Sequence, residues 1–162
     1  MARTLILACG NPLRGDDAVG WQIAKALKSD SPWPEIEVEA AHQLLPEMAE
    51  GISQADIVIF VDASAAHSPG SVIFEPVVPS RLAPETFTHE LNPQILLALA
   101  AALYGRSPAR AFTLVVGAES FELNEGLSES VRNSIPEAVC TILGYLARQA
   151  ALPARVIPTL TA

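Results

Sequence analysis

The 162-residue sequence contains few charged and few aromatic residues. Charged side chains make up 17% of the chain and aromatic ones 6%, whereas half of the residues are hydrophobic. Disordered chains are depleted in the residues that fill a core, so this composition indicates a compact globular protein. Only ten residues are Lys or Arg against 18 Asp and Glu, and the basic residues form no cluster. The net charge of -8 repels phosphate backbones, so we do not expect a nucleic-acid partner.

Cysteines and long apolar runs are also scarce. Cys9 and Cys140 lie far apart and form no CxxC pair, so no disulfide is expected. The apolar run from Ile95 to Leu103 is much shorter than the roughly 20 residues that span a bilayer. The apolar stretch near the N-terminus is too short for the hydrophobic region of a signal peptide. These features predict a cytoplasmic protein without a membrane partner.

Apolar segments of strand length alternate with segments of helical periodicity. This alternation predicts an α/β fold, a three-layer α/β/α sandwich with a mostly parallel sheet of about five strands. The length fits a single domain over residues 1–162, with residues 151–162 as a loose tail. The expected strands are 4–9, 36–40, 57–61, 72–74 and 112–116, and the expected helices include 18–27 and 43–51.

Capping signals place the two remaining helices. Asn92 followed by Pro93 is typical of a helix start, and Gly105 of a helix end. Ser134 and Glu137 have the spacing of a capping box, which predicts the start of the last helix, preceded by a helical turn from Ser128.

Three side chains that can bind metals lie in loops expected at one edge of this sheet. Asp17 lies at the mouth of the first helix, Asp62 directly follows a buried strand, and His89 precedes the helix that starts at Asn92. Loops after parallel strands emerge at the same edge, so the three side chains can converge. Two carboxylates and an imidazole suit a divalent transition metal with positions left open for substrate.

Each of these residues also has a purely structural interpretation. Asp16 is a candidate cap of the first helix, and Asp17 suits the helix dipole. Asp62 is in a position typical of a turn residue, and His89 of a solvated loop residue. His42 follows the second strand and is a reserve ligand or substrate contact.

Other chemistries fit the sequence less well. Gly10, Gly15 and Gly20 match neither common phosphate-loop spacing, and the two adjacent carboxylates of Asp16 and Asp17 would repel a phosphate. Cys9 is a candidate nucleophile with His42 or His89 as base, but its apolar surroundings favour core packing. No GxSxG nucleophile elbow occurs.

With these residues identified, the chain resembles the [NiFe]-hydrogenase maturation proteases. The resemblance rests on five segments that span most of the chain: GNPLRGDDAVG at 10–20, HQLLPEMAE at 42–50, IVIFVDAS at 57–64, HELNPQILLALA at 89–100 and GAESFELNEGLS at 117–128. It implies an α/β/α fold and a metal-contacting triad at Asp17, Asp62 and His89. Ala8 stands where glycine is common in the family, and the first triad position is Asp or Glu among its members.

The resemblance also implies an activity. Members of this family are endopeptidases that trim the C-terminus of a nickel-loaded precursor of the hydrogenase large subunit, so the expected metal is nickel carried by that substrate. Another divalent transition metal is also compatible with the ligands. The metal would polarise the scissile carbonyl or a water, with Asp16 or a spare carboxylate handling the proton. An alternative of equal weight is that Asp17 and Asp62 only bind nickel, while the hydrolytic water is activated by other groups.

We assign Gly10, Asn11 and His42 to substrate binding. Two other classes of function remain open. One is a non-catalytic nickel-binding or precursor-docking chaperone with the same site, and the other is a nucleotide or small-ligand binder that uses the glycine loop.

Overall fold

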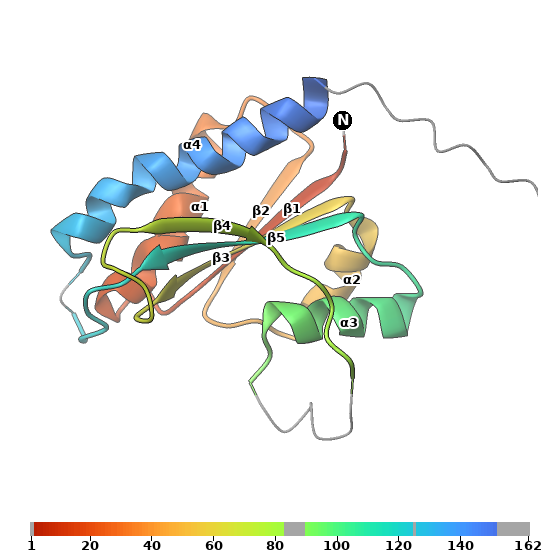
Figure 1. The fold of residues 1–162 in the computed structure, drawn as a ribbon, viewed down its shortest axis with the longest axis horizontal. Coiled ribbons are helices and arrows are strands. Elements are labelled where there is room, and N and C mark those ends of the chain that lie inside the picture. The colour runs from red at the N-terminus through yellow and green to blue at the C-terminus, as the bar shows by residue number, and fades with distance from the viewer. Residues whose placement is uncertain (1, 83–89, 125, 152–162) are drawn as a thin grey trace, which may run out of the picture.

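The computed structural model describes residues 2–82, 90–124 and 126–151. Its centre is a five-stranded sheet in the order β2-β1-β3-β5-β4, in which only β4 runs antiparallel to its neighbour (Figure 1). The predicted α/β class with a mostly parallel sheet is therefore confirmed. The strands are β1 (Thr4–Cys9), β2 (Ile36–Ala41), β3 (Ile57–Ser64), β4 (Val72–Pro76) and β5 (Arg110–Gly117).

Helices cover both faces of the sheet. The helices are α1 (Val19–Asp30), preceded by the short 3₁₀ turn η1 (Gly15–Ala18), α2 (Met48–Gln54), α3 (Pro93–Tyr104) and α4 (Glu129–Ala151). Figure 1 shows α1 and α4 on one side of the strands and α2 and α3 on the other. Two clusters of buried apolar side chains, one on each side of the sheet, form the core.

Alternation along the central strands builds these two clusters. In β1, Ile6 packs in the cluster with α1 and α4, whereas Leu5 and Leu7 pack in the cluster with α2 and α3. In β3, Ile59 and Phe60 divide in the same way. Successive side chains of a strand point to opposite faces, so a strand buried on both faces appears in sequence as a continuous apolar run.

One predicted helix start and one predicted cap are wrong, whereas the helical turn expected from Ser128 is found as the first turn of α4. Helix α2 begins at Met48 instead of residue 43. Residues 42–44, which follow β2, are therefore not helical and line the cavity described below. Helix α4 is continuous from Glu129 through Pro136, and Ser134 is not its cap, because the Ser134 hydroxyl donates to the carbonyl oxygen of Val131 at 2.6 Å. Residues buried at helical spacing run from Val131 past the proline, so packing on the sheet outweighs the missing N–H of Pro136.

The predicted limits of α3 are confirmed. The side chain of Asn92 accepts a hydrogen bond from the backbone N–H of Ile95 at 2.9 Å, and Pro93 occupies the first helical position. Gly105 ends the helix with a φ of 65°, in the left-handed region that favours glycine. These caps fix the helix end that borders the cavity.

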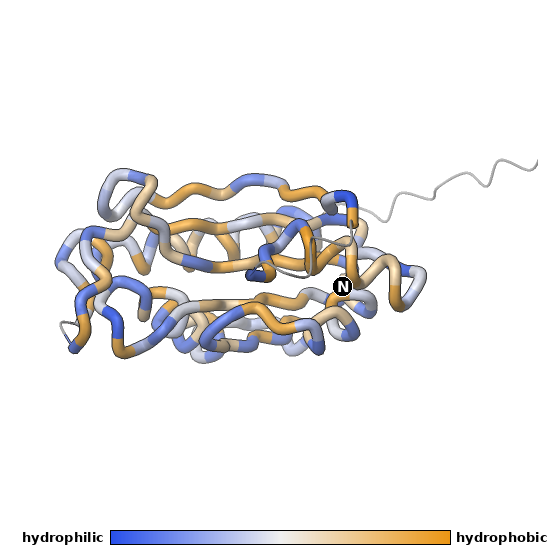
Figure 2. Tube along the Cα trace, turned by 90° about the horizontal axis from the view of Figure 1, so that it is seen from below, coloured by the Kyte–Doolittle hydropathy of each residue, from blue (hydrophilic) through white to orange (hydrophobic). Residues whose placement is uncertain are grey.

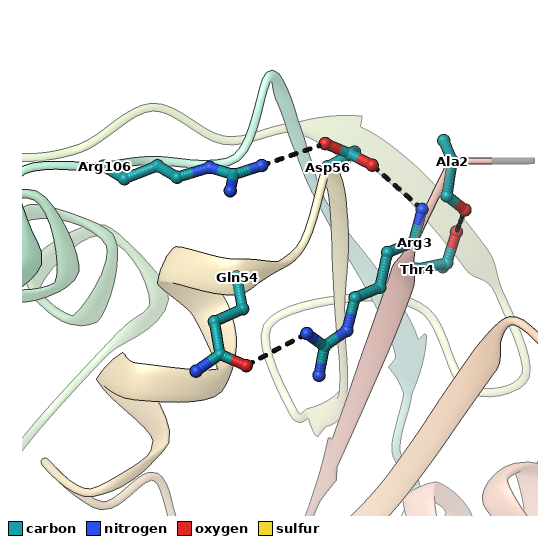
Figure 3. Close-up of polar contacts among 6 residues, drawn as sticks. All are labelled: Ala2, Arg3, Thr4, Gln54, Asp56 and Arg106. Carbon is teal, nitrogen blue, oxygen red and sulfur yellow. Dashed lines mark hydrogen bonds and ion pairs between the residues drawn. The ribbon is translucent and has the colours of Figure 1, made fainter.

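Polar contacts fasten the amino edge of the sheet (Figure 3). Asp56, just before β3, accepts hydrogen bonds from the backbone N–H of Arg3 at 3.0 Å and from the guanidinium of Arg106 at 3.3 Å. The Arg3 guanidinium in turn donates to Gln54 at 2.9 Å. These exposed contacts join β1, α2, β3 and the connection after α3 on the side of the sheet away from the cavity.

Hydrophobic and hydrophilic stretches alternate along the trace in Figure 2. Within the described residues, no helix has the length and apolar character needed to cross a membrane.

Candidate active site

A cavity of about 340 Å³ lies at the carboxyl edge of the central strands. It brings together residues from the loop after β1, the segment after β2, the end of β3 and the start of α3. Asp17, Asp62 and His42, which were selected from the sequence, all line it. Its walls are Leu7, Cys9, Gly10, Asp17, His42, Gln43, Leu44, Phe60, Val61, Asp62, Glu90, Leu91, Asn92 and Pro93.

The backbone of the loop after β1 orients Asp17. The carboxylate accepts a hydrogen bond from the N–H of Asn11 at 2.7 Å through Oδ2. Gly10 has a φ of 144°, and a Cβ there would overlap the backbone carbonyl of Asp17. Only glycine allows the chain to fold back this closely. Gly10 lines the cavity, whereas Asn11 is not among the lining residues and acts on the site through its N–H.

Asp62 carries the most perturbed carboxyl group of the cavity. Strand β3 continues to Ser64, so Asp62 lies within the strand and its position is fixed by the sheet. The pKa of Asp62 is raised to about 6, mainly because the carboxyl group is partly removed from water and further because Asp17 and Glu90 are negatively charged, while a hydrogen bond from the Ala63 N–H opposes the rise. Asp62 lines the cavity and remains exposed to solvent, so its removal from water is only partial.

Cys9 forms part of the cavity wall as a protonated thiol. Burial, together with the nearby charges of Asp62 and Asp17, raises the pKa of Cys9 to about 12. The thiolate is the reactive form of cysteine, so this environment disfavours a nucleophilic Cys9 and agrees with the packing role expected from the sequence.

His42 and Trp21 form an aromatic pair at the cavity. Their rings meet edge to face, with centroids 5.7 Å apart and an angle of 73° between the planes. The indole N–H of Trp21 donates to the carbonyl oxygen of Gly10 at 2.7 Å. Trp21 therefore connects the segment after β2 to the glycine turn that carries Asp17. The sequence analysis did not select Trp21, because nothing in its local pattern distinguishes it from other residues of the first helix.

Asp16 has a role different from the two that the sequence suggested. Its carboxylate makes no capping bond to α1 and is not among the cavity-lining groups. It accepts hydrogen bonds from the backbone N–H groups of Glu119, Ser120 and Ser128 at 2.7–3.1 Å, and from the Ser128 hydroxyl at 2.9 Å.

Electrostatics agrees with this structural role. Burial by itself would raise the pKa of Asp16, but the hydrogen bonds from Ser128, Glu119 and Ser120 outweigh it and lower the pKa below its usual value. Asp16 is fully buried, but the loop backbone that covers it donates hydrogen bonds to its carboxylate. The carboxylate therefore stays ionised and joins two loops.

Glu90 is a cavity residue that the sequence analysis missed. It lines the cavity and its charge acts on Asp62. Its position between the predicted ligand His89 and the helix cap Asn92 was the available signal. His89 itself lies outside the described residues.

The donor set in the cavity suits a cation. Asp17, Asp62 and Glu90 place carboxylates around one space, and a cation would relieve their mutual repulsion. Hard or borderline divalent metals accept such oxygen donors together with an imidazole. Among the described residues, no three His, Cys, Asp or Glu side chains are grouped closely enough to hold a metal ion. A metal ion in this cavity would therefore need donors beyond these carboxylates.

Comparison with known proteins finds the same fold in solved structures. No family model matches the chain, and no curated protein matches its sequence. Among solved structures, the hydrogenase maturating endopeptidase HybD from E. coli shares 25% identity over 91% of this chain and 93% of its own, with a TM-score of 0.73. The [NiFe] hydrogenase maturation protease HycI from Thermococcus kodakarensis shares 25% identity over 90% of this chain and 93% of its own, with a TM-score of 0.71.

A further solved structure, described as an endopeptidase from Escherichia coli, shares 26% identity over 93% of this chain and 94% of its own, with a TM-score of 0.71. All three likenesses cover at least 90% of this chain and at least 93% of the other. The resemblance of this chain to the [NiFe]-hydrogenase maturation proteases is thereby confirmed.

Proposed function

We propose that this protein is an endopeptidase that removes the C-terminal peptide of a nickel-loaded [NiFe]-hydrogenase large-subunit precursor. The observation that carries the proposal is the position of Asp17 and Asp62 in one cavity, at the carboxyl edge of a fold shared with solved hydrogenase maturation proteases. A cytoplasmic location remains a prediction.

In the proposed site, Asp17 and Asp62 would bind the nickel of the precursor, together with His89 and donors from the precursor itself. Nickel belongs to the substrate in this scheme, and when bound it would polarise the scissile carbonyl or a water. A site that is incomplete until the substrate arrives suits an enzyme that acts only on nickel-loaded precursor. Another divalent metal would satisfy the same oxygen donors.

The remaining groups of the cavity suggest how the peptide is handled. Glu90 is the spare carboxylate that we propose for proton transfer, since it lines the cavity and Asp16 does not. Gly10 and the exposed His42 would contact the peptide that enters the cavity, while Trp21 positions His42. Asn11 would support this site indirectly, by donating its N–H to Asp17.

Intact-mass spectrometry of purified precursor, incubated with the protein with and without nickel, tests the activity, the cut site and the metal requirement together. Wild-type protein should shorten only the nickel-loaded precursor. Asp62→Asn should slow cleavage by about 100-fold or more, because it removes one of the two carboxylates proposed to bind the nickel that polarises the reacting group. Asp56→Asn is the matched control, because Asp56 lies just before the opposite end of β3, outside the cavity.

The outcomes separate the alternatives. Unchanged cleavage by Asp62→Asn would show that the site assignment is wrong. Binding of nickel-loaded precursor by wild-type protein without any cleavage would support the chaperone alternative. Stabilisation by nucleotides or phosphate in a thermal-shift assay would support the small-ligand binder.

A further inference from the structure

Strand β2 forms an open edge of the sheet. Among the described residues it pairs only with β1, in parallel. The carbonyl oxygens of Glu35 and Ala41 accept hydrogen bonds from backbone N–H groups of β1 and of the residue after it, at 3.3 and 3.1 Å. The backbone groups of successive strand residues point to opposite sides, so Val38 and Ala40 direct their N–H and C=O away from β1. No described residue pairs with these groups.

One face of β2 is acidic. Glu37 and Glu39 are paired in register with Leu5 and Leu7 of β1, so their side chains point to the face that carries α2 and α3. Both glutamates are exposed, so neither helix covers this part of the edge. Glu37 forms an exposed ion pair with Arg3 at 3.4 Å, whereas Glu39 forms none with a described residue. A further strand at this edge would therefore meet negative charge on this face.

The other face of β2 borders a second cavity, of about 410 Å³. This cavity lies between the end of α1, the connection that follows it and the first half of β2. Its apolar walls include Leu27, Trp33, Ile36 and Val38, and Lys28 lines it from the side of α1. A strand added at the edge of β2 would place every second side chain beside this cavity. Apolar side chains suit these walls, and the positive charge of Lys28 disfavours basic ones.

The open edge leads to the candidate active site. Strand β2 ends at Ala41, and the next residue, His42, lines the active-site cavity. The six residues of β2 cover about 20 Å, at about 3.3 Å per residue. A peptide paired with the whole strand would therefore extend from the active-site cavity to the opposite edge of the sheet.

We propose that the open edge of β2 binds the C-terminal peptide of the precursor as an added antiparallel strand, with apolar side chains toward the second cavity and basic ones toward Glu37 and Glu39. This inference rests on the proposed function. The residues after the cut lead away from the active-site cavity to the free chain end, so along β2 they would run from His42 toward Ile36. Main-chain hydrogen bonds would provide affinity, and the two faces of β2 would select the side chains.

A second copy of this chain fits the same edge less well. Pairing of two β2 strands would bring the Glu37 and Glu39 side chains of both copies together, in a protein with a net charge of -8. Like charges on neighbouring strands destabilise their pairing, and charged side chains on an edge strand oppose association of two sheets. The same charges attract a basic peptide.

Hydrogen exchange of single amides, measured by NMR, tests the pairing directly. The probe is a capped peptide of alternating valine and lysine, added to wild-type protein. The amides of Val38 and Ala40 should then exchange about tenfold more slowly or less, because they become bonded to the peptide. Those of Glu37 and Glu39, which already face β1, should change little. A peptide of alternating valine and glutamate should give no protection.

Two variants connect this edge with cleavage of the precursor. Glu39→Lys should raise the KM for nickel-loaded precursor about fivefold with kcat nearly unchanged, since it replaces attraction by repulsion far from the reacting groups. It should also shift protection to the valine–glutamate peptide. Glu75→Lys is the matched control, because it makes the same charge change at an exposed position of β4, the opposite edge strand.

Ala40→Pro removes one outward N–H, which an edge strand tolerates, and should weaken the binding of the peptide and raise the KM for precursor. Thermal melting identifies a folding defect in this variant. In that case Glu39→Lys and the exchange data on wild-type protein decide.

Four results would overturn this assignment of the edge. They are unprotected Val38 and Ala40 amides with the valine–lysine peptide, equal protection by both peptides, an unchanged KM in Glu39→Lys, and protection that grows with protein concentration alone, which would identify a second copy as the occupant. Each leaves the proposed function standing as long as wild-type protein cleaves the precursor. If wild-type protein does not cleave it, the proposed function itself fails, whatever the exchange data.

Discussion

Replacing Asp62 by Asn should stabilise the metal-free protein at neutral pH even though it slows cleavage. In the folded protein the pKa of Asp62 is raised from 3.8 to about 6, so ionisation of this carboxyl group opposes folding. Asn keeps the oxygen that accepts the Ala63 N–H at 2.8 Å and has no charge to bury. The variant thus removes the unfavourable ionisation and preserves the local hydrogen bond.

The size of the effect follows from the two pKa values. A rise from 3.8 to about 6 corresponds to about 3 kcal/mol for a carboxyl group fully removed from water. Asp62 is exposed to solvent through the cavity, which screens its interactions, so we expect the variant to gain only about 1 kcal/mol at pH 7.

The pH dependence has a defined sign. Between the unfolded and the folded pKa, the folded wild-type protein binds more protons than the unfolded chain, so its stability falls as the pH rises from about 4 to about 6. The variant lacks this titration. Its advantage should therefore be absent near pH 4, grow through this window and stay constant at higher pH.

Urea unfolding of metal-free protein, repeated from about pH 4 to about pH 8, measures this difference. Glu75→Gln is the control, since it removes one negative charge from an exposed position of β4. A stability difference that is independent of pH, or a variant less stable than wild type at pH 7, would refute the electrostatic interpretation of Asp62.

Three further variants test the supports of the site. Asp16→Ala should cost about 3 kcal/mol in urea unfolding, because it leaves backbone donors of a distant loop unsatisfied, and a loss below about 1 kcal/mol would contradict that role. Gly10→Ala should lower the melting temperature more than Gly105→Ala, since an added Cβ meets the Asp17 carbonyl at the first position and open space at the second; equal losses would argue against the tight turn. Trp21→Phe, which removes the hydrogen bond to the Gly10 carbonyl, should lower kcat/KM about fivefold, and an unchanged value would show that the indole N–H is dispensable.

Some parts of the site were predictable because their signals are local. Asp62 directly follows a continuous apolar run, which is typical of a buried parallel strand. Ligands of such sheets bind at the carboxyl ends of the strands. Asn92, Pro93 and Gly105 carry capping preferences that act within one turn of helix. The sheet and the position of Asp17 and Asp62 at one cavity follow from these patterns.

Other parts depend on contacts between distant segments, which leave no local pattern. The partners of Asp16 are 103 to 112 residues away, so its sequence neighbourhood shows only the capping preference of an aspartate before a helix. The start of α2 at Met48 and the passage of α4 through Pro136 are decided by packing against the sheet. The position of Glu90 next to the predicted ligand His89 is a weak signal, because a glutamate in a loop has no distinctive spacing, and its place in the site becomes clear only from the cavity.

The contrast between the two cysteines has a practical consequence. Cys9 is buried with a pKa of about 12, whereas Cys140 is exposed on α4. Alkylating reagents consume thiolates, so a maleimide dye at neutral pH should attach to Cys140 and spare Cys9. The natural protein can thus carry a single fluorophore on its outer helix, and encounters with other molecules can be followed by fluorescence anisotropy without engineering the chain.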